Sequence, residues 1–173
     1  SATTIGNKRP ATAISSNTSE PHTDPTQQLI HELKKPHPDL AILKTIDQSL
    51  LKSTKIGPHE HTLLHLATQN GHLPIVQYLF EHTHADPGAK TKYDATPLHC
   101  AAQNGHLSIV QYLFENAQAD PDAKAKDGVT PLHLAAQNGH LPTVQYLIKN
   151  TQANPDAKTQ DDATPLHYAA QNG

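Results

Sequence analysis

The chain repeats itself with a fixed period of 34 residues, and this period constrains the fold more than any other feature. The segment that begins at Thr62 returns at Thr96, Thr130 and Thr164 with nearly the same letters, in the pattern TPLHLAAQNGH. Self-similarity at a spacing of about 20–50 residues indicates a solenoid, in which each unit packs on its neighbours and no single central core exists. We therefore expect a stack of small, equivalent units.

One period reads as two helices followed by a loop. In the third copy, Thr130 can cap a first helix, and Pro131 suits its first position, where a missing N–H costs nothing. Gly139 predicts a left-handed end to that helix, and Pro142 opens a second helix with apolar residues at helical spacing. Residues 150–163 are rich in Asn, Asp, Thr and Pro, which predicts a turn-bearing loop. The fold class is thus expected to be all-α.

These motifs also carry a resemblance to a known family. The order of a turn, TPLH, paired alanines, GH and an apolar second helix resembles the ankyrin repeats over residues 60–173. The resemblance implies an ankyrin-repeat solenoid of stacked helix pairs with projecting, hairpin-like loops. It also implies recognition of other proteins through the loop tips and the concave groove beside them.

The repeat divides the chain into units. Residues 26–58 keep the apolar spacing of the later copies, with a second helix expected around Leu40 to Ile46, and predict a divergent capping repeat at the N-terminal end of the stack. Because the last copy stops after one helix, we expect the natural chain to continue. The other expected units are a disordered Ser/Thr/Pro-rich tail at 1–25, ankyrin repeats at 60–93, 94–127 and 128–161, and a truncated repeat at 162–173.

The period is one residue longer than is usual in the family, and the added residue falls after the second helix, where the usual Gly is absent. We expect Asn116 and Asn150 to adopt the left-handed conformation there, since Asn tolerates it better than most residues. In the loops, Gly128 keeps the hairpin glycine. Asp94 and Asp162 replace it in the flanking copies, at an expected cost of about 1 kcal/mol each.

Fourteen histidines raise the question of metal binding. Equivalent positions in a stack lie about 10 Å apart, too far for the motif histidines to share a metal ion. The resemblance implies instead that each motif histidine bonds backbone groups joining adjacent units. The motif histidines are His65, His99, His133 and His167. A separate group is expected to contact a partner or solvent, with a zinc-responsive site at His59 and His84 as a third hypothesis; its members are His59, His61, His82 and His84.

No motif for catalysis is found. Cys100 takes the position held by Leu66 and Leu134 in other copies, so we interpret it as a core residue and not as a nucleophile. A Gly-rich phosphate loop, a nucleophile elbow and a zinc-protease motif are all missing from the sequence. We expect no enzymatic activity, no cofactor and no bound metal.

Comparing the copies with one another points to a binding surface. The loop tips differ between repeats while the packing positions are nearly constant, and Tyr93 is a large amphipathic residue suited to anchor a partner. The uniform Gln–Asn pairs of the groove indicate recent duplication or a polar ladder for a backbone-like target, and we favour duplication. The candidate partner-binding residues are His59, His61, Lys92, Tyr93, Lys126, Asp127, Gln160 and Asp161 at the tips and Gln103, Asn104, Gln137 and Asn138 in the groove.

The net charge and the apolar content of the chain restrict the class of partner that it can bind. The net charge of −3 argues against a broad nucleic-acid binder, and no apolar run reaches the length of about 18 residues that a membrane span needs. A single cysteine suits a reducing compartment. We expect a cytoplasmic, monomeric adaptor that binds another protein. The alternative is the targeting arm of a larger multidomain protein, such as a secreted bacterial effector in the host cytoplasm, whose catalytic part lies beyond residue 173.

Overall fold

The computed structural model describes residues 24–172, and within this range it contains helices and loops, one isolated bridge between Ile56 and His61, and no strand. The first helices of the repeats are α4 (Leu63–Gln69), α6 (Pro97–Gln103), α8 (Pro131–Gln137) and α10 (Pro165–Gln171). The second helices are α5 (Leu73–Thr83), α7 (Leu107–Glu115) and α9 (Leu141–Asn150). The N-terminal helices are α1 (Pro25–Leu33), α2 (Ala41–Thr45) and α3 (Gln48–Ser53).

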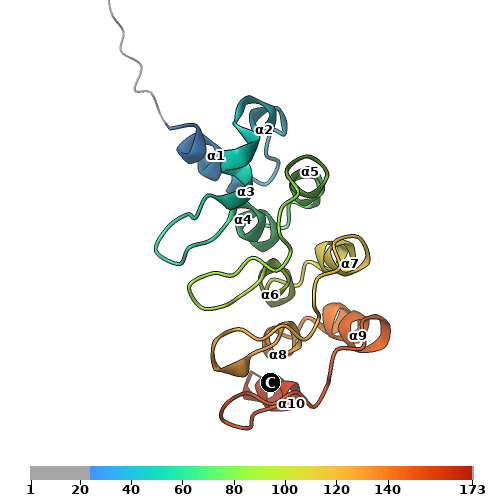
Figure 1. The fold of residues 1–173 in the computed structure, drawn as a ribbon. Helices are drawn as coiled ribbons and strands as arrows, with labels where there is room; N and C mark the ends of the chain where they lie inside the picture. The colour runs from blue at the N-terminus through green and yellow to red at the C-terminus, as the bar shows by residue number, and fades with distance from the viewer. Residues whose placement is uncertain (1–23, 173) are drawn as a thin grey trace, which may run out of the picture.

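The helices stack in two columns. Figure 1 shows α4, α6, α8 and α10 one above the other, with α5, α7 and α9 beside them and the long loops projecting on the opposite side. The helices α4, α6 and α8 each pack on the first helix of the next repeat as well as on their own second helix. The predicted all-α solenoid of stacked helix pairs is confirmed.

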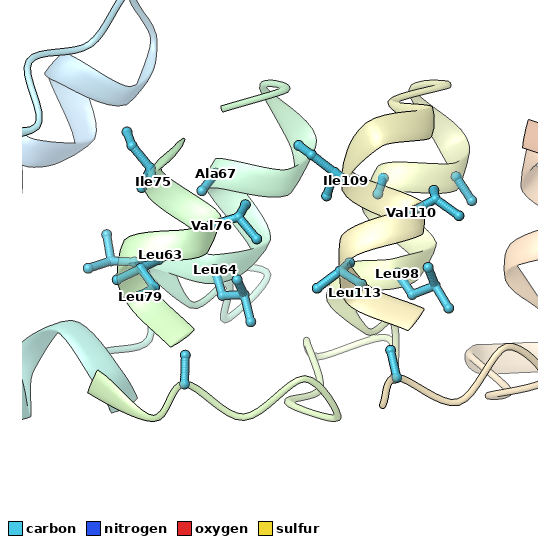
Figure 2. Close-up of a cluster of buried hydrophobic side chains, with 14 of the residues drawn as sticks. Leu63, Leu64, Ala67, Ile75, Val76, Leu79, Leu98, Ile109, Val110 and Leu113 are labelled. Carbon is cyan, nitrogen blue, oxygen red and sulfur yellow. The ribbon is translucent and has the colours of Figure 1, made fainter. Parts of the chain in front are cut away.

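The core is a set of equivalent side chains repeated along the stack. Figure 2 shows it in the first two full repeats. In the second of them, Leu98 comes from α6, and Ile109, Val110 and Leu113 come from α7; all four are fully buried. Burying an aliphatic side chain of this size stabilises the fold by about 1.5–3 kcal/mol. Because each repeat contributes the same small set, stability comes from contacts between neighbours and not from one large core.

The first helices end as predicted. Asn138 follows α8, and Gly139 then takes a left-handed φ of 70°. Gly71 and Gly105 do the same after α4 and α6, with φ of 79° and 68°. A left-handed residue at this point turns the chain sharply, so that the second helix starts only two residues later.

The second helices end differently from the prediction. Asn116 has an ordinary helical backbone, φ −109° and ψ −32°, and Asn150 is the last residue of α9. The left-handed residues are His84, Gln118 and Gln152. After the end of α7 the N–H of Ala119 donates to the carbonyl oxygen of Leu113, six residues earlier, over 2.9 Å, and the left-handed residue Gln118 directly precedes Ala119. Ala119 is buried, so burial of this alanine, and not the preference of Asn, selects the position.

The loop tips contain left-handed residues where the hairpin glycine was expected. Asp94 and Asp162 both have φ of 58°. The third loop differs, because both Asp127 (φ 62°) and Gly128 (φ 80°) are left-handed, and it forms the short 3-10 turn η1 (Lys126–Gly128).

The N-terminal segment departs from the prediction at two points. α1 begins at Pro25, within the predicted tail, because the Asp24 carboxylate accepts a hydrogen bond from the N–H of Thr26 over 3.0 Å. The rest of that tail lies outside the described residues. The predicted second helix is interrupted at Ile46, whose backbone is extended, because Asp47 caps a new helix by accepting from the N–H of Ser49 over 2.8 Å.

Candidate partner-binding surface

The motif histidine of each repeat holds the next loop in place. The Nε2–H of His99 donates to the carbonyl oxygen of Val129 over 3.1 Å, and its Nδ1 accepts from the N–H of Thr96, also over 3.1 Å. His65 bonds Ala95 and His133 bonds Ala163 in the same way, over 3.0 and 3.1 Å. The structural role implied for these histidines is thus confirmed for three copies.

This bonding requires a neutral imidazole, with its proton on Nε2. Burial lowers the pKa of His65 and His99 to about 4, more than the carbonyl contacts raise it. Burial also lowers the pKa of His133. His167 is exposed and bonds only Thr164 of its own repeat through Nδ1, at 3.1 and 2.8 Å. The buried histidines are therefore fixed struts and not free contact residues.

A second set of histidines ties each repeat to the previous one. The Nε2–H of His106 donates to the carbonyl oxygen of Gln69 over 3.1 Å, and His140 donates to Gln103 over 3.0 Å. His72 makes the equivalent bond to Leu33 of α1 over 2.7 Å. Adjacent repeats are thus joined by hydrogen bonds at both ends of their first helices.

The loop tips are joined in a continuous ladder of backbone hydrogen bonds. The N–H of Lys92 donates to the carbonyl oxygen of His59 over 2.9 Å, and that of Lys126 donates to Tyr93 over 2.9 Å. The N–H of Gln160 donates to Asp127 over 2.8 Å. Six of the predicted tip residues therefore lie on one connected ridge, which we call the tip ridge, and its side chains are exposed.

The N-terminal end of the tip ridge is aromatic. The rings of His59 and Tyr93 lie 5.4 Å apart, and His59 lies 5.9 Å from His61 in an edge-on arrangement. Tyr93 is 44% exposed, which is large for an aromatic residue in contact with a neighbour. His61 is half-buried, and burial together with the charges of His59 and Lys55 lowers its pKa.

The middle of the tip ridge is hollowed into a groove of about 460 Å³. We call it the Lys124 groove; its lining residues are Asp94, Lys124, Ala125, Lys126, Asp127, Gly128, Lys158, Thr159 and Gln160. The sequence prediction found only three of them, Lys126, Asp127 and Gln160. Lys124 was missed, although a lysine recurs at this place with the 34-residue period and an aspartate follows four residues later in two copies.

The Gln–Asn pairs lie at the other end of the first helices. Asn104 donates from Nδ2 to the carbonyl oxygen of Cys100 over 2.9 Å, and Asn138 donates to Leu134 over 2.8 Å. Both asparagines thus close the C-terminal turn of their own helix, whereas the tip ridge precedes the N-termini of these helices. The structure does not bring Gln103 or the two asparagines together with the tip residues; the same holds for Gln137, which is half-buried.

The described residues hold no group of three or more His, Cys, Asp or Glu side chains arranged for a metal ion. Cys100 is 7% exposed, and burial raises the pKa of its thiol to about 12. Its position in the packing of α6 agrees with the interpretation as a core residue. Among residues 24–172 no helix combines the length and apolarity required to cross a bilayer.

Comparison with known proteins is consistent with this geometry. A family model described as ankyrin repeats in three copies matches residues 29–125 and 117–173. The two matches together cover the last part of α1 from residue 29, all of α2 and α3, and every later helix. A search of curated proteins found no match to the chain.

Proposed function

Since the chain belongs to the ankyrin-repeat family, whose repeats generally mediate protein–protein interactions, we propose that it is an adaptor that holds a protein partner on the tip ridge. The observation that carries the proposal is the ladder from His59 to Gln160, in which each tip bonds the next through its backbone. Such a ridge holds the backbone of the tips in place, so binding loses little backbone conformational freedom.

Tyr93 is the anchor in this proposal. It is exposed, it rests against the His59 ring, and its carbonyl oxygen accepts the hydrogen bond from Lys126. Tyrosine supplies a large contact area with few rotatable bonds and is frequent at the centre of protein interfaces. Lys92 and Lys126 flank it with charge. Gln103 and Gln137 are a separate and weaker polar zone, because the asparagine beside each is engaged in closing its helix.

The proposal also covers the cellular location and the oligomeric state of the chain. Cys100 is buried and unpaired, as suits a reducing compartment, so we place the adaptor in the cytoplasm, acting as a monomer without catalytic chemistry of its own. The alternative of a targeting arm stays a prediction, since it concerns residues beyond this chain.

The test is quantitative capture of partners from cell lysate by the immobilised chain. We compare the wild type with Tyr93→Ala and Lys126→Ala, and use Gln145→Ala as the control, because Gln145 is exposed on α9, a helix in the column opposite the projecting loops (Figure 1). The two tip variants should lose about tenfold or more of specific capture, the effect of removing one interface anchor. Undiminished capture by both tip variants, or equal loss in the control, contradicts the proposal.

A further inference from the structure

The third loop, which carries Lys124, lacks one negative charge that the second and fourth loops have. In the second loop Lys90 lies 3.7 Å from Asp94, and in the fourth Lys158 lies 3.5 Å from Asp162. The third loop has the equivalent lysine, Lys124, but a glycine where the aspartate would be. Lys124 forms no ion pair with any residue in the described range 24–172.

The balance of charge in the groove is therefore positive. Three lysines line it, Lys124, Lys126 and Lys158, against the carboxylates of Asp94 and Asp127. Asp94 and Lys158 are each paired within their own loops. This leaves Lys124 and Lys126 against Asp127 alone, in a region whose side chains are exposed to solvent.

Gly128 has a left-handed φ of 80°, and a Cβ there would lie 3.3 Å from the Cα of Thr159, so a larger residue is strained at this position. Asp94 holds a left-handed φ of 58° at the equivalent place, and its loop bonds the following loop through the same ladder. The second and fourth loops thus carry an aspartate at this place, whereas the glycine of the third loop leaves Lys124 without the equivalent carboxylate.

We infer that the Lys124 groove receives an acidic segment of the protein partner, whose carboxylates bind Lys124 and Lys126. The side-chain amide of Gln160, exposed at the edge of the groove, adds an uncharged donor. Nucleic acid is the competing polyanion, and the experiment compares it directly with an acidic peptide. This inference rests on the proposed function and names the chemistry of the partner.

The experiment uses a fluorescein-labelled peptide of alternating glutamate and serine, and a matched peptide of alternating glutamine and serine, with binding followed by fluorescence anisotropy at low salt. The glutamate peptide should bind, and about 0.5 M salt should abolish its binding, since exposed charges are then screened. Lys124→Gln should weaken binding about threefold to fivefold, as expected for loss of one exposed charge contact. Lys149→Gln, the matched control for loss of one exposed lysine on α9, outside the groove, should change it less than twofold.

Gly128→Asp supplies the missing carboxylate. It should weaken binding of the glutamate peptide about as much as Lys124→Gln does. Its circular dichroism and melting temperature verify the fold. In ¹⁵N–¹H spectra of the wild type, the peptide should shift the amide signals of Gly128, Lys124 and Thr159 more than those of the second loop. Equal shifts along all loops would overturn the inference.

Three further outcomes would also overturn it: equal binding of the two peptides, equal loss in Lys124→Gln and Lys149→Gln, or tighter binding of a labelled oligothymidylate than of the glutamate peptide. These outcomes are separable from failure of the proposed function. A chain that still captures partners through Tyr93 but shows no preference for the acidic peptide remains an adaptor, with the Lys124 groove unused.

Discussion

The Nε2 atom of His99 lies 3.1 Å from the carbonyl oxygen of Val129, which is thirty positions later in the chain and belongs to the loop of the next repeat. The same ring accepts a hydrogen bond from Thr96 at the start of its own helix. One neutral imidazole therefore connects the N-terminus of α6 to the loop that precedes α8, and the position of the tip ridge depends on it.

Replacement of this histidine should destabilise the stack. We expect His99→Ala to lower the free energy of unfolding by about 2–4 kcal/mol, because it leaves buried polar groups without partners and opens a cavity. His167→Ala is the matched control, since His167 has the same motif but is exposed and bonds only Thr164. It should cost less than about 1 kcal/mol. Urea unfolding measures both, and equal losses would contradict the role assigned to the bond between repeats.

Stability should fall on mild acidification. The pKa of His65 and of His99 is lowered to about 4 in the folded chain, whereas an unfolded histidine titrates near pH 6.5. Between these values the unfolded chain binds more protons, so the free energy of unfolding decreases as pH falls, by at most about 1.4 kcal/mol per pH unit for each imidazole. The contribution is fully present above about pH 6.5.

The measurement is the urea midpoint at pH 7 and at pH 5. We expect a clearly lower midpoint at pH 5 and a smaller decrease in His99→Gln, which lacks one of the titrating rings. An unchanged midpoint between the two pH values would show that these imidazoles are not held neutral by burial.

Much of the fold could be predicted because the same local signals occur in several copies. Thr96, Pro97 and Gly105 each mark a helix boundary, and the same residue types mark it again in the next repeat. The N-terminal segment has no second copy with which its helix boundaries could be compared. Its apolar spacing predicted one continuous second helix, but Asp47 caps a separate helix, α3. The left-handed end of α7 was misplaced because burial of Ala119 determines it, and burial is not visible in the preference of Asn116 for that conformation.

The candidate site was predicted in part for a similar reason. Variation between the tips predicted Tyr93 and Lys126 as candidate binding residues, and both lie on the tip ridge. The ladder that connects them depends on backbone bonds between residues more than thirty positions apart, which side-chain identity does not encode. The role of Asn104 in closing its own helix is likewise a matter of geometry, and it explains the uniform Gln–Asn pairs at least as well as a shared target does.

The glycines that follow the first helices should differ in how well they tolerate substitution by alanine. A Cβ at Gly105 would lie 2.5 Å from Nδ1 of His140, the ring that bonds Gln103, whereas a Cβ at Gly139 meets no atom within 4 Å. Both positions are left-handed, so alanine costs about 1 kcal/mol at either. We expect Gly105→Ala to cost about 1–2 kcal/mol more than Gly139→Ala, because it displaces the His140 ring. Thermal unfolding of the two variants compares them, and equal costs would refute the contact.

Cys100 should be chemically silent in the folded chain. Its thiol is buried and its pKa is raised to about 12, so almost no thiolate is present near pH 8. We expect Ellman's reagent to react roughly a hundredfold or more slowly with the native chain than with the chain in concentrated guanidinium. The denatured chain is the control for a reduced, intact thiol. Rapid reaction under native conditions would mean that α6 opens to solvent.

One buried hydroxyl offers a route to greater stability. Thr143 in α9 is 1% exposed, and its Oγ1 has no hydrogen-bond partner among the described residues. The equivalent positions of the two preceding repeats hold the apolar residues Ile75 and Ile109. Thr143→Val removes the unpaired hydroxyl at nearly constant volume and should raise the free energy of unfolding by about 1 kcal/mol.

Thr151→Val is the matched control for that substitution. Thr151 is also buried, but its hydroxyl donates to the carbonyl oxygen of Leu147 over 2.6 Å and accepts from the N–H of Ala153 over 3.3 Å. The same change there removes two hydrogen bonds and should lower the free energy of unfolding by about 1–2 kcal/mol. Urea unfolding should therefore shift the two variants in opposite directions. A shift of both in the same direction would mean that the hydroxyl of Thr143 has a partner after all.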